Sequence, residues 1–136
     1  MRSEPRTRIQ AYRKLAEVSA TEQLDQLRKS WRDRFGPLPE ATEALVYSLR
    51  CRLLAAAGGV TAVESGGGGV RVQLALDHGL DLPALVSQWS SQATATATRI
   101  VVTTEPVRRG AAWRDVLLGV LRELGRLQRM RARVAV

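Results

Sequence analysis

The sequence has almost none of the residues that build disulfides or metal sites. Its 136 residues include one cysteine and one histidine. One cysteine, Cys51, cannot form an internal disulfide, and together with His78 it cannot supply the usual ligand sets for zinc. We therefore expect neither a metal nor a cofactor, and we expect Cys51, which lies in an apolar helical stretch, to be a packing residue.

Long apolar runs are also missing. No stretch approaches the length of a membrane span, and the first residues, Met1 to Arg6, lack the apolar segment of a secretory signal. These two absences predict a cytoplasmic protein with no membrane partner.

The sequence contains no recognisable catalytic constellation. No glycine-flanked serine elbow surrounds Ser87, Ser90 or Ser91, and the neighbours Asp77 and His78 could not easily join a serine in a triad. The glycines of residues 66–69 are not followed by the Lys-Ser/Thr pair and helix of a phosphate-binding loop, so a hairpin loop is the expected role. We expect no enzymatic activity from this chain.

The composition that remains is that of a folded, basic domain. Hydrophobic residues make up 45% and charged residues 25% of the chain, which predicts one globular domain over residues 1–136. We expect its core within about 7–130 and a basic tail over 131–136. The formal net charge of +8 permits contact with nucleic acid or with acidic proteins, and it equally fits a source that prefers arginine codons.

Hydrophobic periodicity predicts an α+β fold with three N-terminal helices, a β-hairpin plus a third strand in a small sheet, a short helix and a long C-terminal helix. Ser19 and Thr21 are competing caps for the second helix. Trp31, Trp113 and the apolar face of the third helix, including Leu45, should be core. The ranges expected for these elements are helices at 7–18, about 19–35, 39–57, 82–92 and 112–131, strands within 60–76 around a loop at 64–69, a loop at 93–98 and a strand at 99–104.

The segment from Leu24 to Pro39 contains the most specific motif. Leu24, Leu27 and Trp31 recur at helical spacing, Gly36 supplies a helix C-cap and Pro37 prevents continuation. The run Asp-Arg-Phe-Gly-Pro-Leu-Pro at 33–39, preceded by Arg-Ile-Gln-Ala-Tyr-Arg-Lys-Leu-Ala at 8–16, resembles the C-terminal domain of the bacterial transcription-repair coupling factor. The close match covers residues 8–57, and the remainder agrees in the order of its elements.

The resemblance implies a non-enzymatic regulatory function in transcription-coupled DNA repair. In that family the C-terminal domain folds against the N-terminal region of the coupling factor, an ATP-dependent DNA translocase. It thereby covers the surface that recruits the damage-recognition ATPase of nucleotide excision repair until RNA polymerase is engaged. The implied partner is thus the N-terminal region, with the ATPase and RNA polymerase as indirect partners. A domain of a longer protein, a split-gene product and a free-standing regulator all fit this resemblance.

Two sets of charged residues are candidates for binding. The first flanks the motif and would form the regulatory interface, although Asp33 and Arg34 could instead be structural, and Asp25 could pair with Lys29 on the same helix. The second lies opposite the apolar face of the last helix and could contact DNA phosphates or be a solvated surface. The first set is Arg32, Asp33, Arg34, Glu40 and Glu43, and the second is Arg122, Arg126, Arg129 and Arg133.

Overall fold

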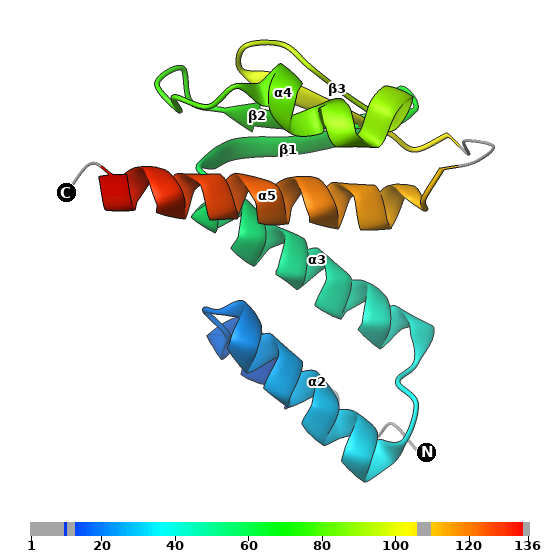
Figure 1. Ribbon diagram of the computed structural model, residues 1–136. Helices are drawn as coiled ribbons and strands as arrows, with labels where there is room; N and C mark the ends of the chain where they lie inside the picture. The colour runs from blue at the N-terminus through cyan, green and yellow to red at the C-terminus, as the bar shows by residue number, and fades with distance from the viewer. Residues whose placement is uncertain (1–9, 11–12, 106–109, 135–136) are drawn as a thin grey trace. The chain divides into compact units, whose positions relative to one another are not determined.

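The structure is a computed structural model that describes residues 10, 13–105 and 110–134 of the chain (Figure 1). The described residues form two compact units, Met1–Leu53 and Leu54–Val136. Together they contain the mixture of helices and antiparallel strands that the sequence predicts, so the α+β fold class is confirmed.

The first unit is helical. Residues 13–17 are helical and are followed by α2, Thr21–Phe35, and by α3, Glu40–Ala57, which begins in this unit. Leu15, Leu24, Trp31 and Val46 form its buried cluster, and Trp31 is only 8% exposed, as its position on the apolar face predicts. The prediction for Leu45 is wrong, because this side chain is 40% exposed while its neighbour Val46 points into the cluster.

The ends of α2 show one prediction confirmed and one corrected. At its C-terminus Gly36 has φ of 77° and donates its N–H to Arg32 O at 2.8 Å, so the glycine cap is present. At the N-terminus neither Ser19 nor Thr21 is the cap. Ala20 occupies that position without a side-chain bond, and Gln23 reaches back to accept the Ser19 N–H at 2.9 Å.

The second unit is a four-stranded antiparallel sheet covered by helices (Figure 1). Its strand order is β1-β2-β4-β3, and α4, η1 and α5 follow or flank the strands. The bounds are β1 Val60–Gly66, β2 Gly69–Leu74, α4 Leu82–Val86, the 3-10 helix η1 Ser87–Gln92, β3 Ala93–Ala95, β4 Arg99–Thr103 and α5 Trp113–Val134.

The hairpin between β1 and β2 is tighter than the sequence predicts. Gly66 pairs with Gly69, so the loop consists of Gly67 and Gly68, with φ of 60° and 79°. Two consecutive positive φ values define the turn that suits the right-handed twist of a hairpin, and glycine adopts them without steric cost. The predicted loop at 64–69 is therefore too long, although its role as a hairpin loop is confirmed.

Residues 93–98 were predicted as a loop, but Ala93–Ala95 forms β3 at the edge of the sheet. Ala93 pairs with Val102 and Ala95 pairs with Ile100. Alanine and threonine have weak local preference for a strand, so the hydrogen-bonding edge of β4 decides the structure of this segment.

The sheet has one apolar and one polar face. Val72, Leu74, Ile100 and Val102 alternate along β2 and β4 and are at most 2% exposed. The residues between them form the other face, where Arg99 donates to Gln73 Oε1 at 3.1 Å. Since α4 and α5 pack against the sheet through buried leucines and valines, the apolar face is the inner one.

The predicted helix at 82–92 is two short elements. Asp81 caps α4 by accepting the Ala84 N–H at 3.1 Å, and Pro83 lies in its first turn. The chain then continues as the tighter η1, which carries the half-buried Trp89 against Gly119 of α5.

The long helix α5 is confirmed, with a wider buried face than the periodicity predicts. Leu117, Val120 and Leu124 lie on the apolar face opposite the arginines and are buried. Trp113 and Leu127 are only partly buried, whereas Val116 and Leu121 are buried as well, because helices and sheet enclose α5 over more than one stripe.

Candidate functional site

Two ion pairs join α2 to α3 within the first unit. The guanidinium of Arg28 donates from Nε to Glu43 Oε1 at 3.0 Å and from Nη2 to Glu43 Oε2 at 2.9 Å. The Nη2 atom of Arg50 lies 2.6 Å from Asp25 Oδ1. A bidentate bond between a guanidinium and a carboxylate fixes geometry as well as charge, so the Arg28–Glu43 pair favours one alignment of the two helices.

The Arg28–Glu43 pair shifts the titration of both groups. The hydrogen bonds from Arg28 lower the pKa of Glu43, and the same bonds raise the pKa of Arg28. The side chains are 33% and 39% exposed, so solvent screens their attraction and the stabilisation is modest. Glu43 therefore contributes to the packing of α2 against α3 through its bonds with Arg28.

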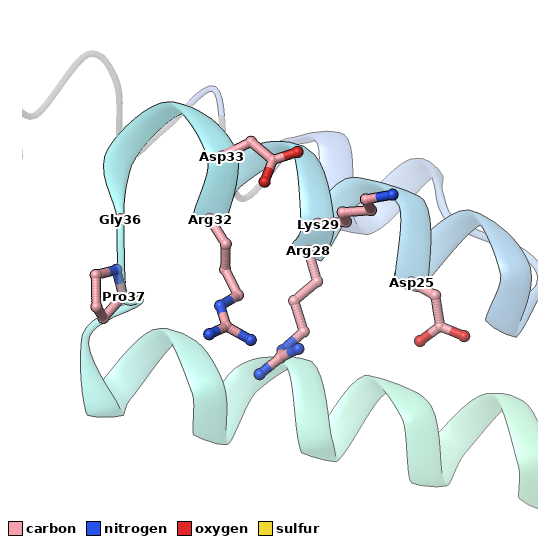
Figure 2. A pocket seen from close by; sticks show the side chains of 7 residues that line it. All are labelled: Asp25, Arg28, Lys29, Arg32, Asp33, Gly36 and Pro37. Carbon is pink, nitrogen blue, oxygen red and sulfur yellow. The ribbon is translucent and has the colours of Figure 1, made fainter.

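A hollow of about 390 Å³ lies beside α2 and its C-terminal turn. Figure 2 shows Arg28 and Arg32 extending from α2 towards α3, whereas Lys29 and Asp33 lie away from α3. The lining residues are Asp25, Arg28, Lys29, Arg32, Asp33, Gly36 and Pro37. Its wall is therefore highly charged and carries both signs.

The five residues predicted to form the regulatory interface have different surroundings. Arg32, Asp33 and Glu40 are exposed, and none has a hydrogen bond or ion pair among residues 10, 13–105 and 110–134. Arg34 lies over the ring of Phe35, 5.2 Å from its centroid, and Glu43 is paired with Arg28. Asp33 makes no bond to its neighbour Arg34 within the described residues, and Arg8, an alternative structural partner for this carboxylate, lies outside them. The interface itself stays a prediction.

The sequence prediction missed Arg28 and misassigned the pairing of Asp25. An i,i+4 spacing favoured a pair between Asp25 and Lys29, but Asp25 pairs with Arg50 of α3 instead. Local spacing reveals only partners on the same helix. The sequence signal for these pairs was the large number of charged residues beside the apolar faces of both helices. This signal was compatible with pairing between the helices but did not identify the partners.

The arginine face of α5 lies in the second unit. Arg122 and Arg129 are exposed and have no hydrogen bond or ion pair within the described part of the chain. Arg126 donates from Nε to Glu123 Oε2 at 3.0 Å and also bonds its other oxygen. Arg133 belongs to the helix, but its side chain is outside the described residues.

The described residues contain no group of three or more histidine, cysteine or acidic side chains arranged to hold a metal ion. The thiol of Cys51 is half-buried, and this burial raises its pKa and keeps it protonated. None of the helices in the same residues combines the length and hydropathy of a membrane span.

These features define an α+β domain whose candidate sites are charged surfaces. Residues 3–85 match the model of the TRCF domain, a match that covers more than half of the chain. The chain therefore belongs to the TRCF domain family, named for the transcription-repair coupling factor.

A solved structure agrees with this family assignment. The crystal structure of the C-terminal domain of a transcription-repair coupling factor superposes with a TM-score of 0.71 at 15% sequence identity. The alignment covers 94% of this chain and 84% of that one. At this identity the likeness establishes the shared fold. No curated protein matches the sequence.

Proposed function

We propose that this chain is a non-catalytic, autoinhibitory domain that acts by contact with the N-terminal region of a coupling factor. The observation that carries the proposal is the charged surface at the C-terminal end of α2. Arg32 and Asp33 are exposed there, make no hydrogen bond or ion pair within the described part of the chain, and border the hollow described above. Arg32 acts on Glu43 only through its charge, from beyond ion-pair distance. Charged groups that make no internal hydrogen bond or ion pair can contact a partner protein without breaking such a bond in the fold.

The scaffold beneath this surface suits a binding role. Trp31 anchors α2 in the core directly beside Arg32, and the Arg28–Glu43 and Arg50–Asp25 pairs hold α2 against α3. A site on packed helices presents its side chains with little loss of conformational freedom on binding. Since Lys29 and Arg32 are basic and Asp33 is acidic, the complementary surface must carry both signs.

Autoinhibition requires a difference in affinity between two states. The domain would favour the closed state by binding the N-terminal region and covering the surface that recruits the damage-recognition ATPase. Engagement of RNA polymerase would then favour the open state. A contact of roughly 3 kcal/mol would hold the closed state about 150-fold over the open one, which a tightly bound partner can overcome.

The test is a titration of the 136-residue chain against the N-terminal region of a coupling factor from the same source, at two salt concentrations. Asp33→Arg should weaken binding at least tenfold, because a like-charge contact replaces an attractive one. A tenfold change corresponds to about 1.4 kcal/mol of binding free energy. Glu17→Arg is the matched control, since Glu17 is an exposed acid in the last helical turn before α2 and should bind as the unchanged chain does.

A second measurement addresses the regulatory role. Adding the chain should reduce binding of the damage-recognition ATPase to the same N-terminal region, and Asp33→Arg should restore that binding. A chain that shows no saturable binding at either salt concentration would contradict the proposal, as would equal effects of the two substitutions.

A further inference from the structure

Helix α5 presents a fixed surface to solvent. Val116, Leu117, Val120, Leu121 and Leu124 are at most 4% exposed and anchor one side of the helix in the second unit. Because this side is immobilised along about two and a half turns, the opposite side cannot rotate away from solvent.

Arginine dominates the exposed side of the C-terminal half of α5. From Arg122 to Arg133 the helix has five arginines and one acidic residue, Glu123. Arg131 is turned towards the rest of the unit, where it donates to the carbonyl oxygen of His78. Arg122, Arg126 and Arg129 lie on one face at i, i+4 and i+7. A helix rises about 1.5 Å per residue, so the row from Arg122 to Arg129 spans about 10 Å.

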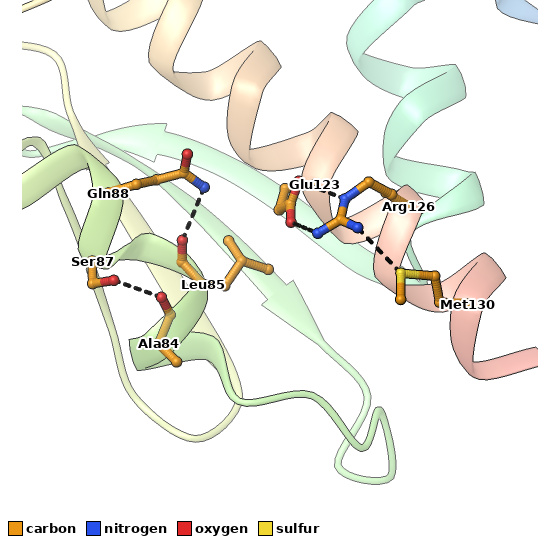
Figure 3. A network of polar contacts seen from close by, with 7 residues as sticks. All are labelled: Ala84, Leu85, Ser87, Gln88, Glu123, Arg126 and Met130. Carbon is orange, nitrogen blue, oxygen red and sulfur yellow. Dashed lines mark hydrogen bonds and ion pairs between the residues drawn. The ribbon is translucent and has the colours of Figure 1, made fainter. Parts of the chain in front are cut away.

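One carboxylate competes for this row. Glu123 holds the guanidinium of Arg126 through both of its oxygens, and Arg126 also contacts Met130 Sδ (Figure 3). The bonds from Arg126 lower the pKa of Glu123, so the carboxylate stays charged well below neutral pH. Arg122 and Arg129, on either side of this pair, have no partner among the described residues.

We propose that this arginine face, comprising Arg122, Arg126 and Arg129, binds the phosphate backbone of duplex DNA without sequence preference. Duplex DNA carries about one negative charge per 1.7 Å, so a straight row of guanidinium groups meets phosphates in any register. An acidic protein would need carboxylates at matching intervals. The face has no asparagine, glutamine or aromatic side chain to read bases, so its contacts position the backbone and do not specify sequence.

Glu123 weakens this binding. A phosphate that contacts Arg126 must displace the carboxylate, and the displaced carboxylate then repels the phosphate. The two unpaired arginines therefore make the first contacts, and Arg126 contributes after exchange. Removing the charge of Glu123 should tighten binding and increase its dependence on salt.

The experiment measures binding of the 136-residue chain to a labelled duplex of arbitrary sequence, by fluorescence anisotropy between about 50 and about 200 mM salt. Arg122→Ala with Arg129→Ala should weaken binding at least tenfold at the lower salt. It should also reduce the slope of log K against log salt by about 1.8, since each lost phosphate contact is worth about 0.9.

The matched control is Arg71→Ala with Arg99→Ala, which removes the same charge from the outer face of the sheet. Its affinity for duplex should fall by no more than the loss of two charges from the whole chain predicts. The slope of log K against log salt should change by less than about 0.5. Circular dichroism confirms that both variants are folded. Glu123→Gln should bind a few-fold more tightly than the unchanged chain.

Four outcomes would overturn the proposal. They are no duplex binding at the lower salt, equal effects of the two double variants, weaker or unchanged binding by Glu123→Gln, and tighter binding of polyglutamate than of duplex. The last would assign the face to an acidic protein. Because these variants lie in the second unit, their failure leaves the Asp33 titration unaffected.

Discussion

The two units of this chain use the same excess of charge in different ways. Each has four more basic than acidic residues. In the first unit, ion pairs such as Arg28–Glu43 cross between helices and help to fix their packing. In the second unit the ion pair Arg126–Glu123 lies within a single turn of α5, and Arg71–Glu64 joins the already paired strands β1 and β2 at 3.6 Å. Apolar side chains hold the helices of this unit against the sheet.

This difference shows that net charge alone does not locate a binding surface. What matters is which charged groups the fold has already used. Within the described part of the chain, the first unit leaves Arg32 and Asp33 without a hydrogen bond or ion pair beside a hollow. The second leaves Arg122 and Arg129 without such bonds on a rigid helix. Mixed charges suit a protein partner, and a row of one sign suits a polyanion.

The largest effect should come from the apolar core of the second unit. Leu124 is 0% exposed, and Leu124→Ala should lower the free energy of unfolding by about 2–5 kcal/mol, because it removes buried surface and leaves a cavity. The control is Leu76→Ala, since Leu76 is 90% exposed and its truncation should change stability by less than about 0.5 kcal/mol. Urea unfolding measures both, and similar losses would contradict the assigned core.

An intermediate effect is expected at His78, which is 7% exposed in the turn after β2. Its Nδ1 accepts the Leu80 N–H at 2.8 Å, so Nε2 carries the proton and donates to Ala97 O at 2.6 Å. His78→Ala should cost about 1–3 kcal/mol of unfolding free energy by leaving two backbone groups without partners. Loss of protection from hydrogen exchange at the Leu80 amide would locate the effect, and an unchanged amide would argue against it.

The smallest effect on stability is expected when an ion pair of the first unit is removed. Arg28 lowers the pKa of Glu43, so the pair contributes stability above the ordinary titration range of glutamate and loses it as the pH falls through the lowered pKa. Glu43→Gln should therefore cost ~1 kcal/mol or less near neutral pH and flatten the loss of stability in acid. Glu40→Gln, an exposed carboxylate without such a partner, should leave the profile unchanged when unfolding is followed between about pH 3 and pH 7.

The sequence predicted the features that depend on local chemistry. Gly36 caps α2 and Pro37 prevents its continuation, as the sequence predicts. The apolar residues of α5 recur at helical spacing, which predicts one long helix there. The glycine hairpin was also predictable, although its two-residue length follows from the pairing of Gly66 with Gly69 across strands.

Features that depend on distant partners were not predictable. Ala93–Ala95 becomes a strand because β4 offers an unpaired edge, and Asp25 meets Arg50 because α3 folds back along α2. For the same reason, the sequence identified the candidate sites only in part. Spacing identified Arg32, Asp33 and the arginine face, but whether a charge was already paired depended on the folded chain.

The turn at Gly67 and Gly68 also makes the chain experimentally accessible. A side chain added at Gly67 would meet nothing within 4 Å, and the hairpin tip belongs to neither candidate surface. Exposed tips of this kind tolerate insertion well. A flexible tag or fluorophore placed between these glycines would report on binding at either surface while leaving both of them intact.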